Sequence, residues 1–202
     1  MTRILVKPIF LVLAISLVSG CATAQLAKGP DTRSLKLHTG AAQVAVVMVE
    51  DARGTTRAGS IGATSVDVPT NVADMVYNYL ITRLNENFEV NVKEAGKVSQ
   101  ADIAQLASSI GVGRTIVSKI TSIKISSFDA IMQPVKTEIL LDLSVLDKNG
   151  QSVYKQSYLG KYEERIGLSI VESKTGQLVE SAVKNLVTEV TSDNGLKKAL
   201  SQ

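Results

Sequence analysis

The sequence predicts an α/β (α+β) protein: a single mixed sheet with helices packed on it, in the order β-α-β-α-β-β-β-α. Segments of continuous or alternating β-branched residues are interspersed with segments in which apolar residues recur every three or four positions. The 202 residues suffice for one domain with a full core. Aromatic residues make up only 4% of the chain and tryptophan is absent, so we expect an aliphatic core.

The amino terminus has the organisation of a secretory signal peptide. Arg3 and Lys7 precede an apolar run from Ile9 to Val18, and the small residues Ser19 and Gly20 follow. The run is too short to span a membrane stably. The only cysteine of the chain, Cys21, comes next. We therefore predict that residues 1–20 are a signal peptide and that cleavage falls between Gly20 and Cys21.

This arrangement resembles the lipobox of bacterial lipoproteins. The resemblance implies a diacylglyceryl group on the Cys21 sulfur, a fatty acyl group such as palmitate on the new amino terminus, and a mature chain that begins at Cys21. Ala22, where an aspartate would signal retention, implies transport to the outer membrane. Each buried methylene contributes about 0.8 kcal/mol, so several acyl chains hold firmly. An ordinary signal peptide or a buried amino-terminal helix is the alternative.

Residues 21–40 are small, polar and turn-prone, and they predict a flexible tether before a globular domain at 41–202. His38, the only histidine, lies here without carboxylate or cysteine companions, which favours a surface residue over a metal ligand.

The first predicted strand, Val44 to Val49, is continuously apolar, which favours a central position in the sheet. A polar, glycine-punctuated stretch from Glu50 to Gly62 then predicts a long loop and a candidate interaction surface. Its candidate residues are Asp51, Arg53, Arg57, Gly59 and Gly62.

Two helices and a strand are expected next. Apolar spacing predicts a helix from Pro69 to about Asn87, and alternation predicts a strand over 88–92. Ser99 and Asp102 suggest a capping pair for a second helix that Gly111 would end.

Three successive strands are predicted over 114–125, 135–145 and 153–162. The apolar phase of the first changes between Ile120 and Ile123, which indicates a bulge or bend. Asp147 to Gly150 predicts a hairpin turn. In the third strand, tyrosines are interleaved with lysines. Such a pattern could stack nucleic-acid bases, but cross-strand pairing on an exposed face explains it more often.

The last predicted helix runs from about Gly176 to Thr191, and its buried stripe repeats at helical spacing. Asn194 and Gly195 break it, and residues 196–200 add one terminal turn.

The residues offer little catalytic chemistry. The predicted domain has no histidine, which removes the usual triads and zinc motifs, and its carboxylates, such as Glu163, Glu164 and Asp142, lack an acid/base spacing. The net charge of +3 falls to +1 without Arg3 and Lys7, so nothing favours nucleic acid. We predict no enzyme activity, no cofactor and no metal.

The apolar strand, Asp51, Arg53 and Gly62 together resemble the YajG family of bacterial lipoproteins over roughly residues 43–200. The resemblance implies an outer-membrane lipoprotein that faces the periplasm, with a poorly defined function and no known active site. The topology is also similar to small lipoprotein domains that form periplasmic rings around export machines, such as those of curli, Pel polysaccharide and flagella. This second similarity is an analogy of fold.

The sequence therefore predicts an outer-membrane lipoprotein whose domain is a non-enzymatic interaction or assembly module of a secretion, flagellar or other envelope complex. Its expected partners are the membrane, through Cys21, and other envelope proteins or copies of itself in a ring, but not nucleic acid. The alternatives are a periplasmic carrier of lipid or another small ligand, and a cell-wall enzyme or its activator. Asp51 and Arg53 are expected to form a local ion pair. The alternative is that Asp51 and Arg53 contact a neighbouring subunit.

Overall fold

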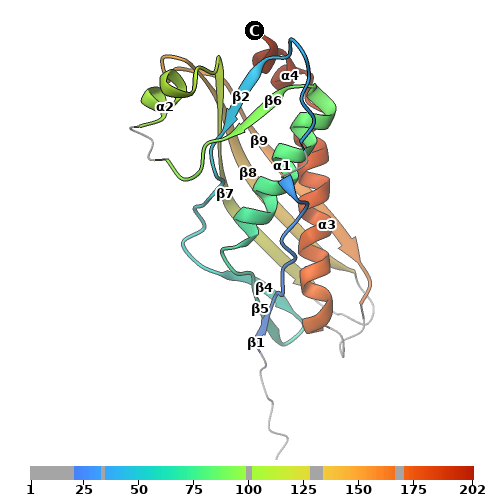
Figure 1. Ribbon diagram of the computed structural model, residues 1–202. Coiled ribbons are helices and arrows are strands. Elements are labelled where there is room, and N and C mark those ends of the chain that lie inside the picture. Colours follow the sequence, from blue (N-terminus) through green and yellow to red (C-terminus); the bar gives the residue numbers. More distant parts are fainter. Residues whose placement is uncertain (1–20, 33–34, 99–101, 128–133, 167–170) are drawn as a thin grey trace, which may run out of the picture.

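The computed structural model describes residues 21–32, 35–98, 102–127, 134–166 and 171–202 (Figure 1). Gly20, the predicted signal peptide and Ser99 of the predicted capping pair lie outside these ranges. Within them, nine strands form one mixed sheet on which helices pack, which confirms the predicted fold class. The elements are β1 (Cys21–Thr23), β2 (Gln43–Val46), β3 (Glu50–Asp51), β4 (Arg57–Ile61), β5 (Thr64–Asp67), α1 (Val72–Phe88), β6 (Asn91–Glu94), α2 (Ile103–Ile110), β7 (Arg114–Ser127), β8 (Val135–Asp147), β9 (Ser152–Glu164), α3 (Val171–Thr191) and α4 (Asn194–Ser201).

Strands β7, β8 and β9 form a long antiparallel meander, which is the largest part of the sheet. The register of β7 against β8 shifts between Ile120 and Ser122, which confirms the bulge predicted from the change of apolar phase. The predicted hairpin turn is also present. Gly150 has a φ of 77° and its N–H donates to the Asp147 carbonyl at 2.9 Å.

The other side of β7 pairs with three short parallel strands in succession. These are β2 at its start, β3 near its middle and β4 at its end. From β2 the sheet continues to β6, and from β4 it continues to β5 and β1. The strand predicted at 44–49 therefore lies inside the sheet, as expected, although β2 ends at Val46.

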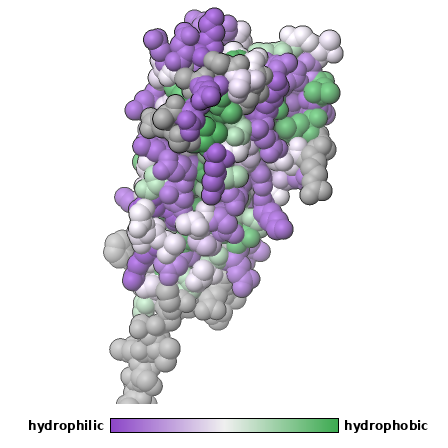
Figure 2. All heavy atoms as spheres, turned by 60° about the vertical axis from the view of Figure 1, so that its left-hand side comes forward, coloured by the Kyte–Doolittle hydropathy of each residue, from purple (hydrophilic) through white to green (hydrophobic). Residues whose placement is uncertain are grey.

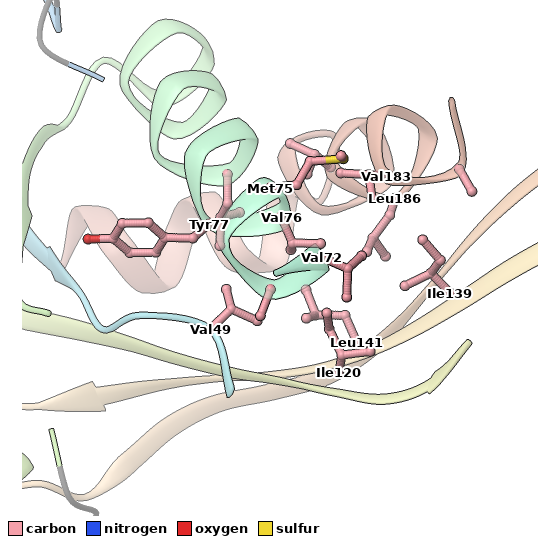
Figure 3. Close-up of a cluster of buried hydrophobic side chains, with 14 of the residues drawn as sticks. Val49, Val72, Met75, Val76, Tyr77, Ile120, Ile139, Leu141, Val183 and Leu186 are labelled. Carbon is pink, nitrogen blue, oxygen red and sulfur yellow. The ribbon is translucent and has the colours of Figure 1, made fainter. Parts of the chain in front are cut away.

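Helices α1 and α3 lie side by side on one face of the meander (Figure 1). Figure 3 shows the core between them and the strands, where Val72 and Val76 of α1 approach Ile120 and Leu141. The core is aliphatic, as the composition predicts. Fully buried members include Leu80, Ile81, Leu84, Ile116, Ile120, Ile125, Ile139, Leu141, Leu143 and Leu178.

The described parts of residues 21–40, 21–32 and 35–40, are attached to the domain and do not form the flexible tether that their composition suggests. β1 pairs in parallel with β5, and the Ala24 N–H donates to the Asp67 carbonyl at 2.8 Å. Ala22 and Ala24 are buried. A Cβ on Gly176 would lie 2.0 Å from the Gln25 carbonyl oxygen, so only glycine lets α3 approach this closely. Small residues suit close packing as well as a flexible chain, and here they pack.

The second half of this segment is held by two asparagines. Asn85, buried in α1, accepts from the Lys36 N–H at 2.9 Å and donates to the Lys36 carbonyl at 2.8 Å. Asn91 exchanges two similar hydrogen bonds with the backbone of His38, each 2.9 Å. The His38 ring meets the Asn85 carbonyl at 3.0 Å, so its Nε2 is the donor in this contact. The histidine therefore helps to attach residues 35–40 to α1.

Four further predictions need correction. The stretch from Glu50 to Gly62 is not one loop, since it contains β3 and β4, which pair with β7. The strand predicted at 88–92 begins only at Asn91, because α1 continues to Phe88 and Glu89 adopts a left-handed φ of 54°. At the carboxyl end, α3 begins earlier than predicted, at Val171, and α4 is longer than one turn.

Candidate functional site

Cys21, the predicted lipidation site, is the first residue of β1, and Ser65 of β5 is its Cα partner. The strand lies at the end of the molecule opposite α4 and the carboxyl terminus (Figure 1). Cleavage between Gly20 and Cys21 would therefore place the new amino terminus at the first residue of a paired strand.

Asp51 and Arg53 form a bidentate ion pair at the end of β3. Arg53 Nε donates to Asp51 Oδ1 at 2.7 Å and Nη2 donates to Oδ2 at 2.6 Å. The side chains are only 4% and 10% exposed for arginine and aspartate respectively. Nη2 also donates to the Val68 carbonyl at 3.0 Å, which ties β3 to the segment before α1. This geometry matches the predicted local ion pair.

The environment of Asp51 favours its ionised form. Burial alone would raise the pKa of this carboxyl, but the hydrogen bonds and positive charge of Arg53 outweigh burial and lower the pKa. Arg53 Nη1 is buried and has no hydrogen-bond partner in the part of the chain that the structure describes. The pair is thus a structural tie inside the fold, with both charges largely withdrawn from solvent.

The other candidate residues of this stretch lie elsewhere. Arg57 is exposed at the start of β4, and its Nη2 donates to the Ser65 hydroxyl. Gly59 passes so close to β7 that a Cβ would lie 2.0 Å from the Ile125 carbonyl oxygen. Gly62 is exposed in the turn between β4 and β5, and its N–H donates to the Ser127 carbonyl at 3.2 Å.

The five candidate residues therefore do not form one surface. On β7, β3 pairs at Lys119 and Ile120, whereas β4 pairs from Ile125 to Ser127. Five residues of strand separate Ile120 from Ile125, which corresponds to roughly 17 Å. Arg57 and Gly62 belong with Cys21 at one end of the molecule, while Asp51 and Arg53 lie near the middle of the sheet.

Among the surface hollows that the described residues line, two bear on the candidate residues and the amino-terminal segment. One of about 500 Å³ lies beside β3 and is lined by Met48, Val49, Glu50, Asp51, Thr70, Asn71, Ala73, Asp74, Lys97 and Val98. Another, of about 590 Å³, lies toward the carboxyl terminus and includes Leu37, which is 92% exposed. Figure 2 shows a largely hydrophilic face with scattered apolar residues. The first hollow is bordered by the exposed carboxylates of Glu50 and Asp74.

Sequence reasoning missed a polar cluster that joins β9 to α4. The hydroxyls of Tyr154 and Tyr158 donate to Asp193 Oδ2 at 2.6 and 2.9 Å. Asp193 Oδ1 accepts from the N–H groups of Gly195 and Leu196 at 2.6 and 3.1 Å, so it caps α4. The hydrogen bond from Tyr154 is the main reason why the pKa of Asp193 is lowered, and burial raises the pKa of Tyr158.

The predicted exposed tyrosine face is thus wrong for Tyr154 and Tyr158, which point toward the carboxyl-terminal helix. The sequence carried one signal for this cluster. Tyrosines four positions apart share a face of a strand, and an aspartate directly before a second helical segment is a typical cap.

Among the described residues, no helix combines the length and hydropathy that a membrane span requires. The same residues contain no group of three or more histidine, cysteine, aspartate or glutamate side chains that could hold a metal ion.

No protein-family model matches the chain, and neither does any curated protein. Among solved structures, the chain is similar to the hypothetical protein CT253 from Chlamydia trachomatis, with 11% identity and a TM-score of 0.51 over 76% of this chain and 97% of that one. The lipoprotein GNA1162 from Neisseria meningitidis has 14% identity and a TM-score of 0.45, covering 75% of this chain and 99% of its own. A PelC dodecamer from Paraburkholderia phytofirmans has 14% identity and a TM-score of 0.42, covering 72% and 89%.

At these identities the likeness concerns the fold alone, and of these three structures CT253 is the one with a TM-score above 0.5. Bacterial lipoproteins are among the solved structures that this chain resembles. The narrower resemblance to the YajG family stays a prediction.

Proposed function

We propose that the chain is a bacterial envelope lipoprotein, held in the outer membrane by acyl chains on Cys21, whose periplasmic domain is a non-enzymatic interaction or assembly module. The observation that carries the proposal is the position of the only cysteine, directly after a signal-peptide pattern. The position of Cys21 in β1 is consistent with this, because it would connect the anchor directly to the folded domain.

The packing of the core favours a module over a ligand carrier. Val135, Ile139, Leu141 and Leu143 of β8 are fully buried. Gly160 lies in β9, and a Cβ there would lie 2.4 Å from the Ala182 carbonyl oxygen of α3. Helix α3 therefore packs directly against the sheet. Neither of the two surface hollows is lined by β8. A carrier would need an apolar space where these side chains meet.

The proposal of no enzyme activity rests on the sequence. His38 is the only histidine, and its ring contacts the backbone of α1. Asp51, Tyr77 and Tyr158 are largely buried and have shifted pKa values, and their side chains hydrogen-bond within the fold. Burial is the main cause of the raised pKa values of the two tyrosines, and the contacts with Arg53 lower the pKa of Asp51, so each shift has a structural cause.

Mass spectrometry of the protein purified from membranes tests the anchor. The expected amino-terminal peptide begins at Cys21 and carries a diacylglyceryl group and a further acyl group. Cys21→Ser should abolish both the modification and membrane retention, whereas Thr23→Ser, two residues away in the same strand, should preserve them. An unmodified thiol on a chain that retains residues 1–20 would contradict the proposal.

Chemical crosslinking in intact envelopes, followed by size analysis, tests the module. We expect discrete crosslinked species that contain a second copy or another envelope protein. A lipidated protein that remains strictly monomeric and partnerless would contradict an assembly role, and co-purified lipid in a stable monomer would favour the carrier.

A further inference from the structure

The predicted anchor is joined to the domain without a linker. Cys21 and Ser65 are Cα partners in parallel β1 and β5, and Ala22, the next residue, is fully buried. On the other side, Gly176 of α3 lies against the backbone of Gln25. The backbone at residue 21 therefore cannot move away from the domain unless β1 leaves the sheet.

The turn between β4 and β5 extends past this attachment point. Because β1 and β5 are parallel, residues that precede Ser65 lie beyond the start of β1. Thr64 and the exposed turn residues Gly62 and Ala63 occupy that position. Two to three residues of strand correspond to roughly 7–10 Å. When acyl chains hold residue 21 at a bilayer surface, this turn reaches the layer of lipid headgroups.

A cation lies at the same end. Arg57 is exposed, and its guanidinium donates to the hydroxyl of Ser65, the residue paired with Cys21. The backbone of Arg57 lies beside its register partner Asp67, at the level of Thr23, and its side chain extends toward the turn to reach Ser65. A guanidinium binds phosphate oxygens well, and phospholipid headgroups present such oxygens.

We propose that the β4–β5 turn, with Arg57 and Ser65, rests in the phospholipid headgroup layer, where Arg57 binds a lipid phosphate. The opposite end, with α4 and the β8–β9 turn, then points away from the bilayer (Figure 1). This inference rests on the proposed lipidation of Cys21, because the acyl chains supply the attachment from which the orientation follows.

The absence of tryptophan from the chain allows a direct test. Ala63→Trp places a reporter in the β4–β5 turn, and Lys148→Trp places a matched reporter in the exposed β8–β9 turn at the other end. Each lipidated mature protein, which begins at Cys21, is reconstituted into phosphatidylethanolamine and phosphatidylglycerol vesicles with brominated acyl chains. We expect quenching and a blue shift of the emission for Ala63→Trp, and neither for Lys148→Trp.

The role of Arg57 is tested in the Ala63→Trp background. Arg57→Gln should weaken the quenching, whereas Arg83→Gln, which removes an exposed cation of α1, should leave it unchanged. Equal quenching of the two tryptophan reporters would overturn the orientation, and an unaltered signal in Arg57→Gln would overturn the phosphate contact. Protein that fails to float with the vesicles would instead contradict the proposed lipidation, so the two failures are distinguishable.

Discussion

The meander with its two long helices and the ribbon formed by β1, β4 and β5 are stabilised in different ways. In the meander, strands of 13 or 14 residues bury a continuous apolar face under α1 and α3. The ribbon has strands of three, five and four residues and is joined to β7 by a short stretch of pairing. It adds only a few side chains to the core, among them Ala22, Ile61 and Val66, and is held besides by backbone hydrogen bonds and close glycine contacts. The part of the domain nearest the predicted anchor is therefore the part with the least core of its own.

The largest effect is expected from Leu141→Ala in the meander. Leu141 is fully buried, and a leucine-to-alanine change in a core costs about 2–5 kcal/mol of unfolding free energy. Leu140→Ala is the matched control, because the neighbouring side chain lies on the opposite face of β8 and is only half-buried. Urea denaturation followed by circular dichroism measures the loss of unfolding free energy in both variants. Equal losses would show that the two faces of the meander are covered to a similar extent.

The next effect concerns the tie between the sheet and α1. Arg53→Met removes the cation from a largely buried pair and leaves Asp51 without its partner, which should cost about 3 kcal/mol. Arg83→Met breaks the exposed pair with Glu86 and should cost less than about 1 kcal/mol. Similar losses for the two variants in urea denaturation would contradict the structural role of the buried pair.

The same pair predicts a pH dependence. The pKa of Asp51 is lower in the folded protein than in the unfolded chain, so the folded state binds fewer protons in acid than the unfolded state. The stabilisation is fully present above the unfolded pKa and is lost as the pH falls through the folded pKa. In Arg53→Met, the free energy of unfolding should therefore fall less steeply as the pH is lowered. Part of the fall should remain, because the pKa of Asp193 is also lowered in the folded protein.

A smaller and more local effect is expected from Gly176→Ala. The added Cβ collides with the Gln25 carbonyl, and overpacking of this kind costs about 1–3 kcal/mol. We expect the residues around β1 to separate from α3 while the meander persists, which should speed tryptic cleavage at exposed Lys28. Gly113→Ala is the control, since a Cβ there meets nothing within 4 Å. Unchanged cleavage would show that the ribbon holds without the contact.

The smallest effect is expected from Asp193→Ala, which removes the cap of α4 and the acceptor of two tyrosine hydroxyls. Loss of a helix cap costs about 0.5–2 kcal/mol. Tyr154→Phe, which removes only one of the donors to this carboxylate, should cost less. Hydrogen exchange of the α4 amides measures whether the loss is confined to that helix. Protection that is unchanged in Asp193→Ala would contradict the cap.

The sequence predicts the meander well because its patterns repeat over many residues. Alternation from Val135 to Val145 identifies β8, and the break in phase after Ile120 identifies the bulge in β7. The ribbon carries no such repeat. In β4 the residues from Arg57 to Ile61 include a glycine and only two apolar side chains, and β1 is three residues long. These strands exist because β7 and β5 offer them backbone partners, which local periodicity cannot reveal.

The same distinction applies to the candidate site. The pairing of Asp51 with Arg53 is predictable because the two residues are close in sequence, whereas the lipidation of Cys21 stays a prediction. The contact between Tyr154 and Asp193 joins positions 39 residues apart, and the one between Asn85 and Lys36 joins positions 49 apart. Such ties depend on how distant elements meet in the fold. The position of Arg57 beside the strand partner of Cys21 likewise appears only once β1 is placed in the sheet.

The contact of α3 with the chain just after Cys21 also has a consequence for the timing of maturation. Gln25 packs against Gly176, so residues near the amino terminus can complete their packing only after residues 171–191 have been synthesised and, in the proposed lipoprotein, exported. Until then the first strand lacks one of its neighbours. For a lipidated chain, this order of synthesis keeps the cysteine in open polypeptide during the interval in which the acylating enzymes must reach it.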